Sequence, residues 1–183
     1  MWYNSDYEEV IDDATKPKFI IMNISYDLIH KDKLPIFDGV LWHEHIYEYQ
    51  LETVLSSDGI GSQRKAIFKD KLENVDSKLP AVLYTSYELL YDDGMLLECG
   101  EGSWGGIGFI CLSTASRYIQ FLACFENSNP FVIAEYINGR VRAMNNIGEI
   151  WVFEYEGHQH PSIKISMDNP TNLDYQWKNR DSL

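Results

Sequence analysis

Basic residues are scarce in this sequence. Its 183 residues include 15 Lys+Arg against 28 Asp+Glu, which gives a formal net charge of −13. A surface with this balance repels nucleic acid and anionic membranes, and it speeds association with a positively charged partner. Acidity also favours solubility by itself, so the location of the charges has to decide between the two explanations. We expect a basic protein as the partner, and neither nucleic acid nor a membrane.

Cysteines and long apolar runs are also few. Cys99, Cys111 and Cys124 are odd in number, and two of them lie within the apolar runs FICLS and FLACF. This pattern fits buried free thiols in a reducing compartment better than a disulfide framework. The stretch MWYNSDYEEVIDD has no apolar core, and no window approaches the ~20 apolar residues that span a bilayer. We therefore expect a cytoplasmic protein.

Familiar catalytic motifs are missing as well. The chain has no G-x-S-x-G elbow, so we assign no catalytic residue and expect a protein that is not an enzyme. Its histidines include two H-x-H pairs, His43 with His45 and His158 with His160. Such a pair on a strand could clamp a metal, but Glu48 follows the first pair too closely for the cupin pattern. We expect no metal and no cofactor, and keep a metal-dependent enzyme or ligand-binding protein as the alternative.

The spacing of apolar residues predicts an α+β fold in a single domain. Residues 43–59 carry Tyr47, Leu51 and Val54 at helical spacing and end in Ser-Ser-Asp-Gly. Residues 62–75 carry apolar side chains on one side of a second helix. We expect N-terminal helices packed on a mainly antiparallel β-meander of five or more strands. The segments are an acidic arm or short helix at 1–16, a strand (18–26) plus two helices within 17–80, an antiparallel sheet at 81–167 and a polar C-terminal tail at 168–183.

Short strands joined by turn residues dominate the sequence after residue 81. GFICLS, RYIQFLACF, FVIAEYI, RVRAMN, EIWVFEY and SIKIS follow one another, with turn chemistry at Asn138-Gly139 and NNIG. Connections this short permit only antiparallel neighbours. RYIQFLACF is apolar on both faces, which places it centrally, beneath the helices. YELLYDDGMLLEC predicts a hairpin at Asp93-Gly94, although a helix that ends at Asp92 competes with it.

The segment CGEGSWGGIGF contains G-x-G-x-x-G at Gly100, Gly102 and Gly105. A dinucleotide fingerprint needs a helix after the glycines, whereas GIGFICL here is typical of a strand. The segment also resembles the glycine-rich loop of protein kinases, but there is no Lys or Arg between Lys78 and Arg117, no H-R-D and no D-F-G. We therefore expect the glycines to form a bend or bulge between two strands.

The same part of the chain carries charges of a single sign. Every charged residue between Leu79 and Ser116 is acidic, and aromatic residues are interleaved with the acids. Such a patch is typical of an association surface, since Tyr and Trp anchor interfaces, although chance segregation in an acidic chain gives the same pattern. We expect partner-binding residues here, namely Glu88, Tyr91, Asp92, Asp93, Glu98, Glu101 and Trp104.

The stretch ENSNPFVIAEYINGRVRAMNNIGEIWVFEY, together with the acidic composition, resembles in organisation the immunity proteins of bacterial polymorphic-toxin systems, including contact-dependent growth inhibition. That resemblance implies a cognate toxin domain, often a basic nuclease, held inactive in a stoichiometric complex. No residue motif defines these proteins, so the resemblance assigns no functional residue. A regulatory or scaffold module without toxin chemistry is the remaining alternative.

Overall fold

The structure is a computed structural model, and it describes residues 18–20, 34–35, 37–55, 62–72, 74–76, 80–103, 105–154 and 160–167. Every regular element in this part of the chain is a β-strand. The predicted α+β class is therefore wrong, because the described residues form antiparallel sheets without a helix. It follows that no helix in the described ranges is long and apolar enough to cross a membrane.

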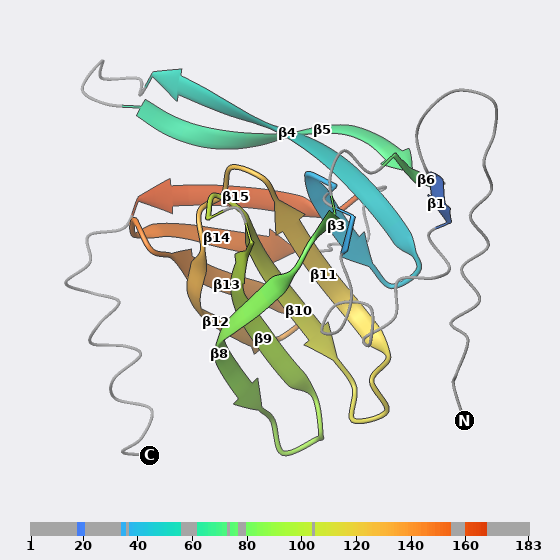
Figure 1. Cartoon of the computed structure of the whole chain (residues 1–183). Helices are drawn as coiled ribbons and strands as arrows, with labels where there is room; N and C mark the ends of the chain where they lie inside the picture. Colours follow the sequence, from blue (N-terminus) through green and yellow to red (C-terminus); the bar gives the residue numbers. More distant parts are fainter. Residues whose placement is uncertain are drawn as a thin grey trace.

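Two antiparallel sheets make up the body of the molecule (Figure 1). The larger has the strand order β5-β4-β3-β11-β10-β9-β8, and the smaller has the order β12-β13-β14-β15. The strands of the larger sheet are β3 (Gly39–Trp42), β4 (His45–Leu55), β5 (Ser62–Leu72), β8 (Leu83–Leu90), β9 (Leu96–Gly102), β10 (Gly108–Ser113) and β11 (Ile119–Phe125). Those of the smaller sheet are β12 (Phe131–Ile137), β13 (Arg140–Asn145), β14 (Glu149–Glu154) and β15 (Ser162–Met167). Two short pairs complete the list, β1 (Lys18–Ile20) with β6 (Asn74–Asp76) and β2 (Leu34–Pro35) with β7 (Pro80–Ala81).

The main core fills the space between the two sheets. Trp151 of the smaller sheet is fully buried and packs against Phe125 of the larger sheet and Phe131 of its own, with ring centroids 5.2 and 5.5 Å apart. A second buried cluster, which includes Leu41, Phe109, Leu122 and Cys124, lies on the opposite face of the larger sheet. The central strand β11 is therefore buried on both faces, as its sequence predicts, but beneath a sheet rather than beneath helices.

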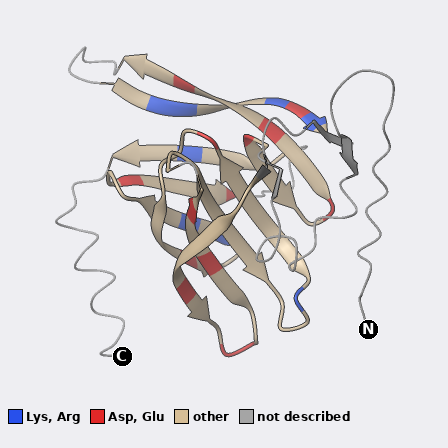
Figure 2. Cartoon of the chain, viewed as in Figure 1, with Lys and Arg blue, Asp and Glu red and all other residues tan. Residues whose placement is uncertain are grey.

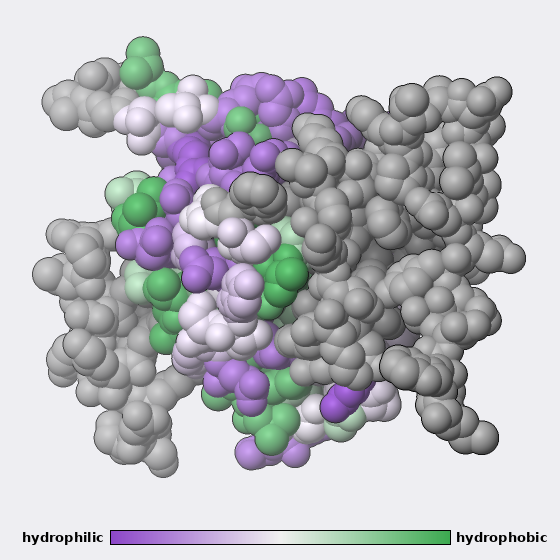
Figure 3. All heavy atoms as spheres, in the orientation of Figure 1, coloured by the Kyte–Doolittle hydropathy of each residue, from purple (hydrophilic) through white to green (hydrophobic). Residues whose placement is uncertain are grey.

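The two predicted helices at 43–59 and 62–75 are wrong, because the described residues of these ranges form mainly the strands β4 and β5, which pair as one long hairpin. A separation of four residues puts two side chains on the same face in a helix and also in a strand, so the Tyr47–Leu51 spacing fits both structures. Tyr49 decides between them, because Tyr47, Tyr49 and Leu51 alternate into the core with period two. The polar outer side of this hairpin forms the hydrophilic upper part of the view in Figure 3.

The antiparallel strands predicted within 81–167 are confirmed. Tyr91 donates its N–H to Met95 O at 2.8 Å, and Gly94 adopts φ 82°, so the hairpin at Asp93-Gly94 is present and the competing helix is wrong. Asn138 and Gly139 have φ of 52° and 77°, the geometry of a type I′ turn between β12 and β13. Of the strand predicted at 18–26, β1 covers 18–20. The acidic arm at 1–16 and the tail at 168–183 lie outside the described residues.

Candidate functional site

The glycine segment forms the turn between β9 and β10, so the bend expected from the sequence is present. Gly102 N donates to Ile107 O at 3.0 Å, and Gly105 closes the turn with φ 70°. Gly100 lies opposite a bulge in β8, where a Cβ would come within 2.0 Å of Tyr84 O. A strand follows this turn directly, so the backbone lacks the helix N-terminus that would hold a pyrophosphate.

The histidines of the described residues do not converge on a metal site. His43 lies in the β3–β4 turn with φ 55°, and His45 begins β4 with its ring against Tyr47. His160 stacks on Phe68 at a centroid distance of 4.0 Å, while its H-x-H partner at position 158 lies outside the described residues. Across the described ranges, no group of three or more His, Cys, Asp or Glu side chains could hold a metal ion.

The acidic residues predicted as partner contacts lie on the β8–β9 hairpin, at the bottom of the view in Figure 2. Glu88 is exposed on β8, and Asp92 and Asp93 are exposed at the hairpin tip. Glu101 is also exposed, but it lies at the far end of β9, about 20 Å from the tip at ~3.3 Å per residue. The structure therefore brings Glu88, Asp92 and Asp93 into one region and leaves Glu101 in another.

Two other predicted contact residues are buried or half-buried, and a third lies outside the described ranges. Glu98 is only 3% exposed and accepts a hydrogen bond from the Thr85 hydroxyl at 3.3 Å. Tyr91 is half-buried, with its hydroxyl oxygen accepting the N–H of Tyr136 at 2.6 Å. Trp104 is not among the described residues.

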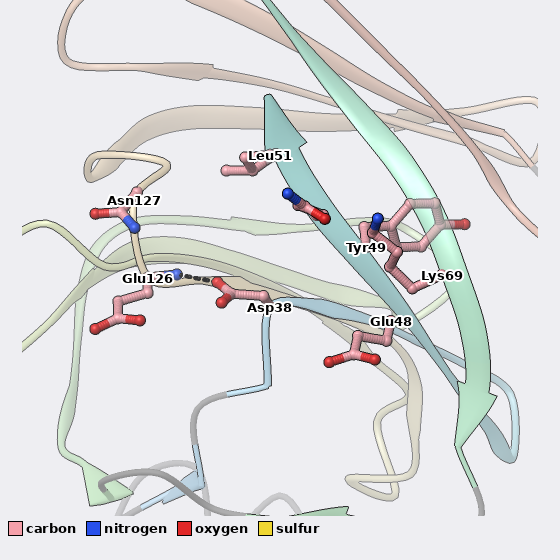
Figure 4. Close-up of a pocket in the computed structure, with 8 residues that line it drawn as sticks. Asp38, Glu48, Tyr49, Leu51, Lys69, Glu126 and Asn127 are labelled. Carbon is pink, nitrogen blue, oxygen red and sulfur yellow. Dashed lines mark hydrogen bonds between the residues drawn. The ribbon is translucent and has the colours of Figure 1, made fainter. Parts of the chain in front are cut away.

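A polar pocket of about 370 Å³ opens at the end of the larger sheet where the turn between β9 and β10 lies. Three carboxylates line it, from Asp38, Glu48 and Glu126, and Figure 4 shows them on one side of the pocket. The remaining lining residues are Tyr49, Gln50, Leu51, Lys69 and Asn127. We call this the acidic pocket.

Strand pairing brings these carboxylates together from distant parts of the sequence. Gly39 of β3 pairs with Glu48 on one side and with Cys124 on the other, so Asp38 and Glu126, which flank those strands, are neighbours. One oxygen of Asp38 accepts the N–H of Glu126 at 2.7 Å, which fixes the two chain segments together. Asp38 and Glu126 are 88 residues apart along the chain.

A β-bulge supplies Lys69, the one cation among the described residues that line the acidic pocket. Glu48 pairs with Asp70 and Tyr49 pairs with Phe68, so Lys69 is the extra residue on β5. The described lining residues thus include three carboxylates and one ammonium group, so negative charge is in excess among them. Tyr49 forms part of the wall, where burial, followed by the nearby Tyr47, raises its pKa and keeps the phenol neutral. Its hydroxyl donates to the carbonyl of Pro161.

An open pocket of this composition suits a cationic side chain. Carboxylates accept hydrogen bonds from guanidinium or ammonium groups, and the Gln50 and Asn127 amides add further acceptors. Sequence reasoning missed Asp38 and Glu126, because nothing local marks two isolated acids as neighbours. Only a correct strand order of the larger sheet could have joined them.

Comparisons with family models, with curated proteins and with solved structures gave no match to this chain.

Proposed function

We propose that this chain is a binding protein that neutralises a basic partner protein, in the manner of an immunity protein that holds a toxin domain in a stoichiometric complex. The observation that carries the proposal is the acidic pocket, which Asp38, Glu48 and Glu126 line from three separate segments of the chain. The formal net charge of −13 supports it, because an acidic surface steers a basic protein toward it.

The proposed partner presents lysine or arginine side chains, as a nuclease does toward phosphates. A nuclease whose cationic groups occupy an acidic pocket cannot use them on nucleic acid, so binding and inhibition coincide. The proposal needs no catalytic step of this chain, and it gives the H-x-H pairs no role.

Charge reversal tests the pocket. The partner is first captured from the native host with the wild-type chain, and the captured domain is then tested for toxicity in cells that lack this protein. We expect Glu48→Lys with Glu126→Lys to lower the association rate constant and to weaken its dependence on salt. Glu44→Lys with Glu52→Lys is the matched control, since both residues are exposed acids outside the pocket.

If both double variants lower the association rate constant equally, the acidic pocket is not the binding site and only the net charge of the protein matters. Capture of a domain that does not harm cells would contradict the immunity role and favour a regulatory or scaffold module.

A further inference from the structure

β8 is the outermost strand of the larger sheet, and its outer edge differs from the edges that β5 and β15 form. Within the described ranges it pairs with β9 alone. The neighbouring strand β12 lies against the inner face of the hairpin instead of bonding along its edge. Tyr136 of β12 donates its N–H to Tyr91, and the Ser86 hydroxyl donates to Phe131 O at 3.5 Å.

The hydrogen-bond alternation identifies which backbone groups point outward. Tyr91 and Met95 are a hydrogen-bonded pair next to the turn, so Leu89 with Leu97 is the next such pair. Glu88 and Leu90 occupy the intervening non-bonded positions, and their N–H and C=O groups therefore point away from β9. These two residues offer two donors and two acceptors on the outer edge.

Natural sheet edges usually carry lysine, proline or another device against pairing with a second chain. β5 follows this rule with Lys65, Lys69 and Lys71, and β15 follows it with Lys164. β8 has neither lysine nor proline over its eight residues. Its bulge between Thr85 and Tyr87 protects the first half only, and leaves the half that contains Glu88 and Leu90 regular.

The side chains along this edge select the kind of strand that fits. Leu90 is 68% exposed, which gives an added strand an apolar contact in the regular half of β8. The charged residues beside it are acidic, Glu88 on the strand and Asp92 and Asp93 at its end, and no cation occurs between Lys78 and Arg117.

We propose that β8 accepts an extended basic segment of the partner as an additional antiparallel or parallel strand, bonded to Glu88 and Leu90. This inference rests on the proposed function for the basic character of the partner, but it concerns a different surface. The acidic pocket lies toward the opposite edge of the larger sheet, about 20–25 Å away at ~4.8 Å per strand. Strand addition supplies affinity through main-chain bonds, and the acids supply the preference for a basic segment.

The free protein gives the first test. Amide hydrogen exchange measured by NMR will be fast at Glu88 and Leu90 and slow at Tyr87 and Leu89, because only the latter pair donates to β9. A synthetic peptide of alternating lysine and valine is then added as the probe. We expect it to slow exchange at Glu88 and Leu90. The same peptide N-methylated at every residue keeps its charge but loses its backbone donors on both edges, and we expect it not to do so.

A proline substitution gives the second test with the captured partner. Leu90→Pro removes an outward N–H without breaking the β8–β9 ladder, and it should weaken binding about tenfold or more, the effect of one or two lost hydrogen bonds. Leu90→Thr is the matched control, since it shortens the side chain and keeps the N–H. If the proline variant does not fold, the exchange measurements on the wild-type chain still decide.

If the lysine–valine peptide or the captured partner binds and the amide hydrogen exchange at Glu88 and Leu90 does not change, strand addition is wrong. Equal affinities of Leu90→Pro and Leu90→Thr for the captured partner would also overturn it. In both cases a strong effect of the pocket variants Glu48→Lys and Glu126→Lys would leave the proposed function standing, so the two failures are distinguishable.

Discussion

Arg64 of β5 and Glu149 of β14 form a bidentate ion pair that joins the two sheets. Nε lies 2.7 Å from Oε1 and Nη2 lies 2.8 Å from Oε2. Both side chains are mostly buried, with 16% and 7% of their surface exposed. Asn145 donates to the same carboxylate at 2.7 Å, and the guanidinium carbon lies 5.8 Å from the centre of the Trp151 ring. This pair fastens the long β4–β5 hairpin to the smaller sheet.

Truncation of this arginine is expected to destabilise the protein strongly. Arg64→Ala leaves Glu149 buried without its counter-ion, and the free energy of unfolding should fall by about 3 kcal/mol. Urea denaturation measures the change.

Arg64→Lys is the matched control, because it keeps the charge but cannot form both hydrogen bonds. It should fall between Arg64→Ala and the wild-type chain. A loss below about 0.5 kcal/mol for Arg64→Ala would show that the other contacts between the hairpin and the smaller sheet are enough to hold it.

The sequence predicted the second half of the fold far better than the first. From β8 onward, turns such as Asp93-Gly94 and Asn138-Gly139 set both the element boundaries and the antiparallel pairing. The β4–β5 hairpin has the apolar spacing of two helices because apolar residues recur only irregularly in its exposed half. Leu55 is 82% exposed, so hydrophobic periodicity in that half does not report burial.

The candidate site was even less accessible to sequence reasoning. The acidic residues between positions 79 and 116 are easily recognised in the sequence. In the folded chain, however, Glu98 is buried and Glu101 lies far from the hairpin tip. Asp38 and Glu126 become neighbours only because β3 and β11 pair. Long-range strand pairing of this kind depends on packing energy over the whole sheet, which local patterns do not contain.

A small side chain added at Gly100 is expected to disrupt the β8–β9 hairpin. The Cβ of Gly100→Ala would lie 2.0 Å from the carbonyl oxygen of Tyr84, and backbone must move to relieve the overlap. We expect a loss of about 2 kcal/mol or more in the free energy of unfolding, measured by thermal or urea denaturation.

Gly105→Asn tests the alternative that replacing any glycine of this segment lowers the free energy of unfolding. Gly105 has φ 70° and open space around its Cα, and Asn tolerates that backbone region best among residues with a side chain. Its loss should stay under about 1 kcal/mol. Equal losses at both positions would mean that the close approach at Gly100 is not the cause.

The three cysteines should be inert in the native protein. Burial raises the pKa of Cys99 to about 12, and burial, followed by the nearby Asp38, raises that of Cys124 to about 12. Burial and then Glu98 raise the pKa of Cys111 as well. A neutral thiol is a poor nucleophile, so an aromatic disulfide reagent should label none of them until urea unfolds the chain.

The same raised pKa values predict a loss of stability in alkali. In the unfolded chain a cysteine thiol has a pKa of ~8.5, whereas in the folded chain the same thiol is still protonated at that pH. The buried neutral thiols therefore contribute fully to the free energy of unfolding below about pH 8.5. This contribution falls as the pH rises toward the pKa of the thiols in the folded chain. Denaturation midpoints measured across this range should fall less steeply for Cys99→Ala than for the wild-type chain. Equal slopes would show that Cys99 already ionises in the folded protein.

Glu48 offers a test that separates function from stability. It lies directly opposite Asp70 in the β4–β5 register, and like charges in that position are destabilising by about 0.2–1 kcal/mol. Glu48→Gln should therefore raise the free energy of unfolding while it weakens binding of the captured partner. Glu52→Gln is the matched control, because Glu52 lies opposite Lys65 on the same hairpin and outside the acidic pocket. It should lower stability slightly and leave binding unchanged. A carboxylate that reduces stability and increases affinity is what a binding surface requires, whereas a drop in stability for Glu48→Gln would identify Glu48 as a structural residue and remove it from the proposed site.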